Sequence, residues 1–293
     1  MPLPPLTRLP RPARNGVLLL DHLVAAYPSL SRRAAKALID DRLVFVNGRR
    51  IWMARHPLQT RDVVEVLSSA LPRSSKSSSA AASSPRPPAP VRILLDDPAF
   101  LVADKPPNLL SVGNRSLETR LRDQLSLPAL RAVHRLDKDT TGAILFAKTP
   151  EARAALVAQF EASSVKKLYH AIVAGTLPEP LVEIDTPIDR LPALSRVRLL
   201  SAVRRPYPAA HVAVSIETGR THQIRIHLHS VGCPVLGDRH YFTPLSARAR
   251  EVPRPMLHAA SLRFLHPLTN APLSVSSPLP RDFLSTLRLL RLT

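Results

Sequence analysis

A serine-, alanine- and proline-rich stretch over residues 74–90 divides this chain of 293 residues into two parts. The stretch contains no large apolar side chain, so it cannot bury enough surface to offset the entropy lost on ordering it. We therefore expect a linker over 70–91, a small folded unit over 16–69 and a large one over 92–293. Residues 1–15 are rich in proline and arginine, which argues against an amphipathic transit helix, and we expect a disordered basic arm there.

The charge balance indicates a polyanionic partner. The chain carries 41 Lys and Arg against 22 Asp and Glu, a formal net charge of +19. Residues 1–91 carry +9 of that charge and the remaining residues +10, so the smaller part is much more basic per residue. Nucleic acid is the leading candidate partner. Aromatic residues make up only 4% of the chain, too few for a sheet that binds RNA mainly by stacking several bases.

Cysteine content and hydropathy exclude several classes of protein. The single cysteine, Cys233, cannot form an internal disulfide or a multi-cysteine zinc or iron–sulfur site, and a reducing, cytoplasmic setting fits best. It lies in a Gly-Cys-Pro turn without an assigned base, so we interpret it as a packed small residue rather than a nucleophile. No apolar run approaches the roughly 18 residues of a membrane helix, and we expect no membrane span.

Histidines in the last third of the chain raise the question of a metal site. No Asp or Cys at ligand spacing accompanies them, so no metal is expected. His222 falls on an apolar face, where a hydrogen-bonded core histidine is the ordinary outcome. The histidines considered are His222, His227, His229, His240, His258 and His266.

The small part shows two helical segments and two or more strands. Apolar spacing predicts a helix within 17–27, and Ser31 is a good N-cap for a second helix that starts RRAAK. The sequence LVFVNG predicts a strand ending in an Asn-Gly turn, and VVEVL from Val63 a second strand. Taken alone, the cations on the second helix would be an ordinary solvated face. The passage over 18–50 nevertheless resembles the alpha-L RNA-binding domain of ribosomal-protein S-four type, which implies that Arg32, Arg33 and Lys36 contact RNA phosphates.

In the large part, a polar loop precedes an apolar strand. Two short strands are predicted at 93–95 and 100–103, followed by a Lys-Pro-Pro turn. The loop over 134–141 then leads through Gly142 into the strand 143–147, and such a loop can hold a catalytic group rigidly. Asp137 lies in this loop with Arg135 two residues before it. For a lone loop aspartate, a structural ion pair or turn cap is the ordinary interpretation.

Two alternating segments follow. The first, from Thr221, predicts a strand, and Arg225 would lie in the middle of its polar face, where a buried cation can pair with a carboxylate, with Arg220 at the strand entrance. That face would hold Thr221, Gln223, Arg225, His227 and His229. The second segment, KKLYHAIVAG, places Tyr169 on one face with small residues, which leaves space for a flat ring.

Five ordered motifs resemble the pseudouridine synthases of the RluA type. The first is HRLDKDTTG over 134–142, with Thr141 where serine is commoner, and the second is KLYHAIVAG from Lys167. The others are TGRTHQIRIH over 218–227, GCPVLGD over 232–238 and LHAASLRFLHP from Leu257. The resemblance runs from about residue 93 to about residue 284.

This resemblance implies an α+β fold whose mixed, largely antiparallel central sheet is flanked by helices, with the active site in a cleft across it. It implies isomerisation of uridine to pseudouridine in RNA by Asp137, which attacks either C1′ of the sugar or C6 of the base. Arg225 would pair with Asp137, and Tyr169 would face the uracil ring. The residues implied in substrate binding are Arg135, His134, Thr141, Arg220 and Leu262. The reaction has no net redox or hydrolytic change, so no cofactor is expected.

Other interpretations remain open at this point. The chain could be a non-catalytic RNA-binding or ribosome-assembly factor that kept the fold, although Asp137, Tyr169 and Arg225 are all present. A hydrolase that uses Asp137 and a histidine would release free uracil. For the enzyme, large-subunit ribosomal RNA is the expected substrate and transfer RNA the second candidate, and a monomer is expected.

Overall fold

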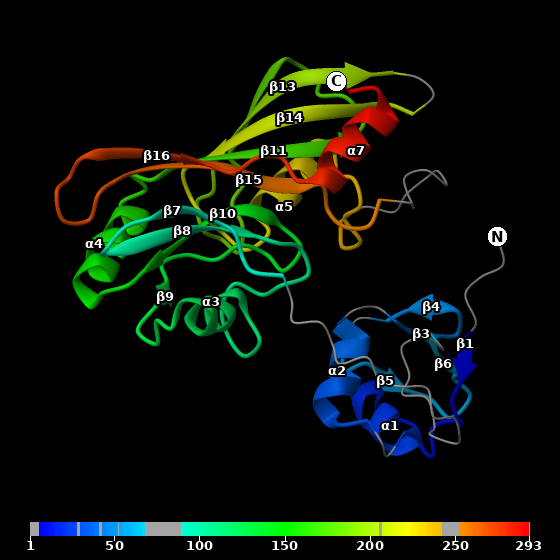
Figure 1. Ribbon diagram of the computed structural model, residues 1–293. Coiled ribbons are helices and arrows are strands. Elements are labelled where there is room, and N and C mark those ends of the chain that lie inside the picture. The colour runs from blue at the N-terminus through cyan, green and yellow to red at the C-terminus, as the bar shows by residue number, and fades with distance from the viewer. Residues whose placement is uncertain are drawn as a thin grey trace. The chain divides into compact units, whose positions relative to one another are not determined.

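The computed structural model describes residues 6–27, 30–40, 43–51, 53–67, 89–204, 207–241 and 252–292. The chain divides into two compact units, residues 1–86 and 87–293, and each is described by itself (Figure 1). Of the expected linker over 70–91, residues 70–88 lie outside the described residues, as do residues 1–5 of the expected arm.

Among its described residues, the small unit contains two helices, a four-stranded sheet and a two-stranded sheet. The four-stranded sheet has the order β1-β6-β3-β4, and β2 pairs with β5. The elements are β1 (Leu6–Arg8), β2 (Val17–Leu18), α1 (Leu19–Ala26), α2 (Arg32–Asp40), β3 (Val44–Val46), β4 (Arg49–Arg50), β5 (Pro57–Leu58) and β6 (Val64–Leu67).

Local sequence signals account for most of this unit. The backbone N–H of Ala34 donates to Ser31 Oγ at 3.1 Å, which confirms Ser31 as the residue that caps α2. Asn47 and Gly48 have positive φ angles of 51° and 74°, the conformation that joins β3 and β4 in a tight hairpin. Leu23 and Ile39, on the two helices, are fully buried in the core of the unit.

The expectation of a disordered arm is wrong for residues 6–15. Leu6–Arg8 form β1 and pair antiparallel with β6, and Leu9 is buried in the core of the small unit. The Asn15 side chain accepts a hydrogen bond from Thr60 N at 2.8 Å. Strand β1 pairs the backbone groups along an edge of β6 that would otherwise be unpaired. The prolines at positions 10 and 12 do not prevent this pairing, because they follow the paired residues.

The large unit is built on a ten-stranded sheet with the order β12-β13-β14-β11-β15-β10-β8-β7. Strand β16 pairs with β15, and β9 pairs with β10. The β10–β15 pair is parallel and the others are antiparallel, as expected for a mixed, largely antiparallel sheet. The strands are β7 (Ile93–Asp96), β8 (Phe100–Lys105), β9 (Arg131–Ala132), β10 (Thr141–Ala147), β11 (Lys166–Ala174), β12 (Leu181–Ile184), β13 (Ser195–Val203), β14 (Ala209–Ile216), β15 (Leu257–Leu265) and β16 (Pro272–Ser276).

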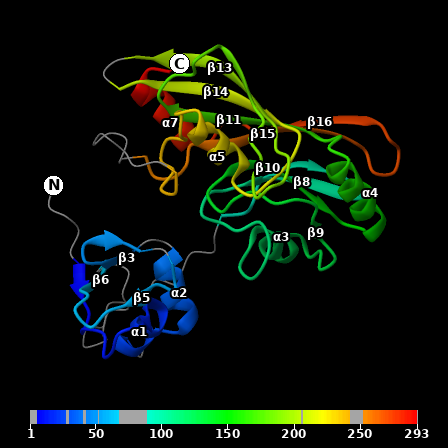
Figure 2. The same cartoon turned by 180° about the vertical axis from the view of Figure 1, so that it is seen from behind.

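Helices cover both faces of this sheet (Figures 1 and 2). Side chains of α3 (Leu117–Leu125) and α5 (Gln223–Ser230) pack with Ala171 and Val173 of β11 on one face. Side chains of α4 (Pro150–Glu161) and α7 (Arg281–Leu290) pack in two clusters that contain Leu145 and Ile172 on the other. The Thr149 hydroxyl caps α4 by accepting from Ala152 N at 3.2 Å, with proline at the first helical position.

The strand expected from Thr221 is in fact the helix α5, so the expectation of one polar strand face is wrong. Ile224 and Leu228 are four residues apart and both buried, which is helical spacing. The apolar positions of this short segment also fit the period of a strand, and such a segment cannot be assigned by periodicity alone. The turn before the helix selects the helix over the strand. In this turn the Gln223 side chain accepts hydrogen bonds from the Thr218 hydroxyl at 2.7 Å and from Arg220 N at 3.1 Å.

Candidate active site

A small pocket of about 70 Å³ opens where the 134–141 loop, β11 and the start of α5 meet. The loop between β14 and α5 completes its wall. The residues lining it are Arg135, Leu136, Asp137, Thr140, Tyr169, Ile216, Gly219, Arg220, His222, Gln223, Ile224, Arg225 and Leu257. Five residues expected at the site therefore share one pocket: Arg135, Asp137, Tyr169, Arg220 and Arg225.

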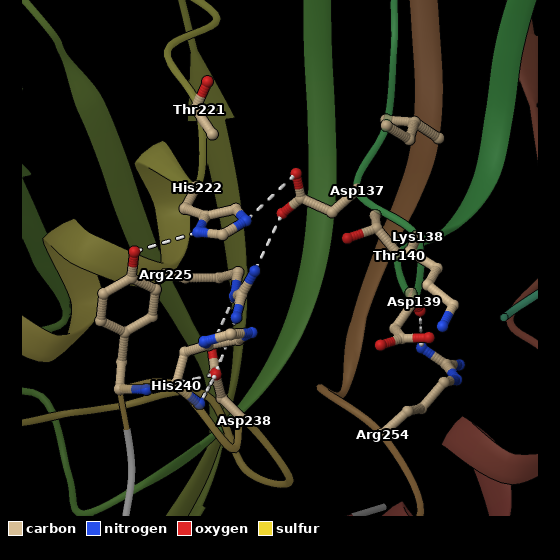
Figure 3. Close-up of polar contacts among 12 residues, drawn as sticks. Asp137, Lys138, Asp139, Thr140, Thr221, His222, Arg225, Asp238, His240 and Arg254 are labelled. Carbon is tan, nitrogen blue, oxygen red and sulfur yellow. Dashed lines mark hydrogen bonds and ion pairs between the residues drawn. The ribbon is translucent and has the colours of Figure 1, made fainter. Parts of the chain in front are cut away.

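The Asp137 carboxylate faces side-chain nitrogens of Arg225 and His222 across this pocket. Arg225 Nη1 donates to Asp137 Oδ2 at 3.3 Å, and His222 Nε2 lies 3.8 Å from Asp137 Oδ1 (Figure 3). The Asp137 side chain is 29% exposed and that of Arg225 only 5%. A carboxylate that is partly open to solvent therefore lies against a buried cation, which attracts and orients it.

Arg225 is itself held by a second aspartate. Its Nε donates to Asp238 Oδ2 at 2.5 Å and its Nη2 donates to Asp238 Oδ1 at 2.8 Å, a bidentate pair that leaves Nη1 directed at Asp137. Burial tends to raise the pKa of Asp238, but the hydrogen bonds and charge of Arg225 outweigh it and the pKa is lowered. In the sequence, Asp238 stands out only as the last residue of the GCPVLGD motif. Its role as the partner of Arg225 is not predicted from the sequence.

His222 is a second residue that sequence reasoning missed, because it was interpreted as a core histidine. It lies in the left-handed region with φ 57°, immediately before α5, and this conformation directs its ring into the pocket. Its Nδ1 and the hydroxyl of Tyr241 are hydrogen-bonded at 3.0 Å. Burial and then the neighbouring guanidinium of Arg225 lower the pKa of His222, although Asp137 acts in the opposite direction. The position of His222 inside the TGRTHQ motif was the one feature of the sequence that could have indicated a place at the site.

Tyr169 and two arginines form the rest of the pocket. Tyr169 is 7% exposed, and burial followed by the Asp137 charge raises the pKa of its hydroxyl above the ordinary value, so the hydroxyl is protonated. Arg135 Nη2 donates to Thr221 Oγ1 at 2.8 Å, and Arg220 Nε donates to the carbonyl of Pro192 at 3.1 Å. The arginines thus flank the pocket opening while the tyrosine forms its wall.

A buried lysine holds the loop that carries Asp137. Lys105, at the end of β8, is fully buried, and its Nζ donates to the carbonyls of Lys138 at 2.7 Å and Thr140 at 2.8 Å. It also donates to the carbonyl of Pro106 at 3.1 Å. Burial is the main cause that lowers the pKa of Lys105 to about 7.

A buried arginine binds the same loop from another element. Arg254 Nη1 donates to the carbonyl of Asp139 at 3.2 Å (Figure 3). The same guanidinium forms a bidentate pair with Asp282 of α7 at 2.7 and 3.0 Å. Together with Lys105, it provides donors to the carbonyls of the three residues that follow Asp137. No local sequence pattern indicates a role for either cation, because the loop carbonyls that they contact are 33 to 115 residues away in the chain.

Three residues expected at the site do not line the pocket. His134 stacks on Phe160 of α4 with ring centroids 4.6 Å apart, and its Nε2 accepts from Leu145 N at 3.1 Å. Burial and then Lys167 lower the pKa of His134 to about 3, which keeps the ring neutral and able to accept. The Thr141 hydroxyl is hydrogen-bonded to His258 Nδ1 at 2.9 Å.

Leu262 is the third expected residue that does not line the pocket. Its side chain is 1% exposed and packs in the apolar cluster that includes residues of α4. The physical reason is distance along β15: beyond the register shift of the β11–β15 pair, Leu262 lies opposite Lys167 and packs in the cluster with α4 rather than beside Tyr169. Thr140 and Leu257 occupy the pocket positions instead.

The remaining histidines and the cysteine have structural contacts. Among the described residues no group of three His, Cys, Asp or Glu could hold a metal ion. His227 is buried with both ring nitrogens hydrogen-bonded, to Ser195 Oγ and to the carbonyl of Thr186, each at 2.9 Å. Cys233 is buried, and burial raises the pKa of its thiol. Within the described ranges, no helix is both long and apolar enough to cross a membrane.

The small unit presents its own set of cations. The side chains of Arg32, Arg33 and Lys36 are exposed on α2, which is the second helix predicted from the sequence. Arg32 Nη1 lies 2.7 Å from Asp21 Oδ1 of α1, an exposed ion pair of small energetic weight.

Comparisons with known proteins agree with this geometry. The model of a family described as RNA pseudouridylate synthase matches residues 99–230. A relative from Pseudomonas aeruginosa, ribosomal large subunit pseudouridine synthase D, is 38% identical over 69% of this chain and 72% of its own length. A relative of the same name from Pasteurella multocida is 29% identical over 94% of this chain and 92% of its own length. The solved structure of human RNA pseudouridylate synthase domain containing 4 matches with a TM-score of 0.58 and 26% identity, over 68% of this chain and 92% of that chain.

Proposed function

Because this chain belongs to the RNA pseudouridylate synthase family and is an isomerase of uridine in RNA, we propose that its substrate is large-subunit ribosomal RNA. Relatives from several bacteria that carry a large-subunit name support this choice. The net charge of +19 supports a large, highly charged RNA as the partner. Transfer RNA is the alternative substrate, and the experiment below includes it.

We infer that Asp137 is the nucleophile. The reaction breaks the bond between N1 of uracil and C1′ of ribose and forms a bond between C5 and C1′, so no external electron or water is consumed. A carboxylate can carry this exchange by bonding transiently to C1′ or to C6. The contact of Asp137 with Arg225, which Asp238 holds in a bidentate pair, supports the assignment because it orients the carboxylate in the pocket.

Tyr169 then provides the flat wall against which the uracil ring lies. Its position in the pocket beside Asp137 supports this role. Its raised pKa means that the hydroxyl keeps its proton in the resting enzyme. If Tyr169 takes the C5 proton late in the reaction, it therefore has to pass its own proton to another acceptor.

Cations at the pocket opening bind the target nucleotide. Turning a base out of a helix costs a few kcal/mol, which contacts to the extruded nucleotide have to offset. We assign this role to Arg135 and Arg220, whose places at the pocket support it. His222 we assign as a positioning residue for Asp137, on the strength of the 3.8 Å separation of Nε2 from the carboxylate.

For the small unit we propose an alpha-L type RNA-binding domain. The two consecutive helices followed by the β3–β4 hairpin support this proposal, as does the exposure of Arg32, Arg33 and Lys36 on one short helix. Such cations contact phosphates without reading the base sequence. Substitution of all three by glutamine is expected to weaken RNA binding and to lower the salt dependence of the affinity.

Tritium release tests the proposed function. Purified protein is incubated with C5-tritiated transcripts of large-subunit ribosomal RNA and of transfer RNA, in parallel with the variant Asp137→Asn. We expect release from the ribosomal transcript that requires Asp137, with no free uracil. Release from transfer RNA alone would replace the proposed substrate. Free uracil would indicate a hydrolase, and release that persists in Asp137→Asn would remove Asp137 from the mechanism.

A further inference from the structure

A basic trough crosses the large sheet away from the Asp137 pocket. It consists of two adjoining hollows, of about 400 Å³ and 450 Å³, which share Lys166 of β11 and Arg263 of β15. We use the name basic trough for the surface formed by Lys166, Leu168, Ser215, Ser261, Arg263 and Ser274.

The basic trough and the active-site pocket lie on opposite faces of the same strands. Leu168 lines the trough, whereas its neighbour Tyr169 lines the pocket, and successive side chains of a strand point to opposite faces. The two surfaces meet at the end of β14, where Ile216 lines both. RNA that extends from the pocket to the trough would therefore pass around the end of β14 at Ile216.

Two like charges lie directly opposite each other in the basic trough. Lys166 and Arg263 are cross-strand partners in the β11–β15 pair, and both side chains are exposed. Like charges in this arrangement destabilise a sheet. Within the described part of the chain, neither side chain forms an ion pair. The sheet therefore carries a repulsion that a bound anion would relieve.

The acidic side chain in the trough is engaged elsewhere. Glu217 and Arg196 also line the first hollow, where Arg196 forms ion pairs with both Glu217 and Glu183. The Glu217 carboxylate also interacts electrostatically with Lys166 but forms its ion pair with Arg196. The Nζ of Lys167 is likewise occupied, because it donates to the carbonyls of Glu217 at 2.9 Å and Thr218 at 3.2 Å. The positive charge that remains available is that of Lys166 and Arg263.

We propose that the basic trough binds the phosphodiester backbone of the RNA substrate, with phosphates placed at Lys166 and Arg263 and hydrogen-bonded by the serine hydroxyls around them. This inference rests on the proposed function, because it extends the path of the same RNA beyond the pocket. Cations combined with hydroxyl donors are the usual ligands of nucleic-acid phosphates. The continuity with the pocket at Ile216 favours RNA over an acidic protein segment.

Salt-dependent binding tests the proposal. The full-length double variant Lys166→Gln/Arg263→Gln is compared with wild type and with Arg153→Gln/Arg288→Gln, which removes the same charge from exposed positions on α4 and α7. The probes are a poly(U) oligonucleotide and the ribosomal transcript. Two lost contacts should reduce the slope of log Kd against log salt by about 1.4, because each single-strand phosphate contact contributes about 0.7. Affinity should fall on the order of tenfold at about 0.1 M salt.

Each outcome separates this proposal from the proposed function. If both double variants change the slope equally, the effect is one of net charge and the basic trough is not a binding surface. If the trough variant binds RNA like wild type while wild type still releases tritium, only the trough is rejected. If wild type neither binds nor isomerises the ribosomal transcript, the proposed substrate fails, and poly(U) still tests the trough. The melting temperature checks folding, and it should not fall, because the substitutions remove a repulsion.

Discussion

Arg254 donates a hydrogen bond of 3.2 Å to the main-chain carbonyl of Asp139, two residues after Asp137. The same guanidinium is paired with Asp282 at the start of α7, so the position of α7 is connected to the loop that carries Asp137. Lys105 binds the carbonyls on either side of Asp139 from β8. The geometry at Asp137 thus depends on two buried cations that do not line the pocket.

We expect Arg254→Lys to lower kcat about tenfold or more, because a lysine cannot keep both the bidentate pair with Asp282 and the bond to Asp139. Single-turnover tritium release measures the chemical step, and RNA affinity measured in parallel separates positioning from binding. The control is Asp96→Asn, which removes an ion pair with Lys148 away from the loop. An equal loss of affinity and rate would contradict a positioning role.

We expect Asp238→Asn to reduce kcat/KM by a factor of ten or more and to lower the free energy of unfolding by about 3 kcal/mol. The physical reason is that Arg225 would keep its buried charge without a full partner. Urea unfolding and tritium release measure the two effects. As a control, Glu183→Gln removes one carboxylate from the exposed ion pairs of Arg196 and should change stability by less than about 1 kcal/mol. Wild-type activity in Asp238→Asn would show that Arg225 needs no second carboxylate.

Stability should fall as the pH falls below about 6.5. His170 Nδ1 and His211 Nε2 are hydrogen-bonded at 2.8 Å, and burial followed by His170 lowers the pKa of His211 to about 4. A folded-state pKa below the unfolded value means that the unfolded chain binds more protons between pH 6.5 and 4, so acid favours unfolding. His211 alone should contribute a loss of about 2 kcal/mol between pH 7 and pH 5.

Urea unfolding at the two pH values measures this loss, with His211→Gln as the comparison. Because glutamine does not titrate, the variant should lose less stability than wild type over the same interval. The same loss in both proteins would mean that other groups govern the acid response. His134, whose pKa burial lowers to about 3, adds to the loss in both proteins and so cancels in the comparison.

Gly142→Ala should prevent normal folding of the large unit. Gly142 has φ 111°, and a Cβ there would lie 2.2 Å from the carbonyl oxygen of Ala259 on the parallel neighbour β15. The contact is with backbone, which cannot move without separating the strands. Soluble yield and melting temperature measure the effect. Gly219→Ala is the matched control, because a Cβ there meets nothing within 4 Å and its φ is not positive.

Much of the fold could be predicted where the signal is local. The Ser31 cap, the Asn47-Gly48 turn and the alternation of β11 each depend on residues within a few positions of one another. The ordered motifs around Asp137, Tyr169 and Arg225 likewise identified residues that share one pocket, because the resemblance carries spatial information that a single residue does not.

The amino-acid sequence by itself identified the family, predicted most of the elements and indicated five residues that share one pocket. Only the tertiary structure decided that α5 is a helix, since its apolar spacing fits two periods and the Gln223 turn selects one. It also decided which side chains reach the pocket, since His222 lines it beside Asp137 whereas His134 does not. Asp238 does not line the pocket, and the structure shows it as the buried partner of Arg225. The physical reason is that a side chain's direction and partners are set by contacts between segments far apart in the chain, and no local pattern records those contacts.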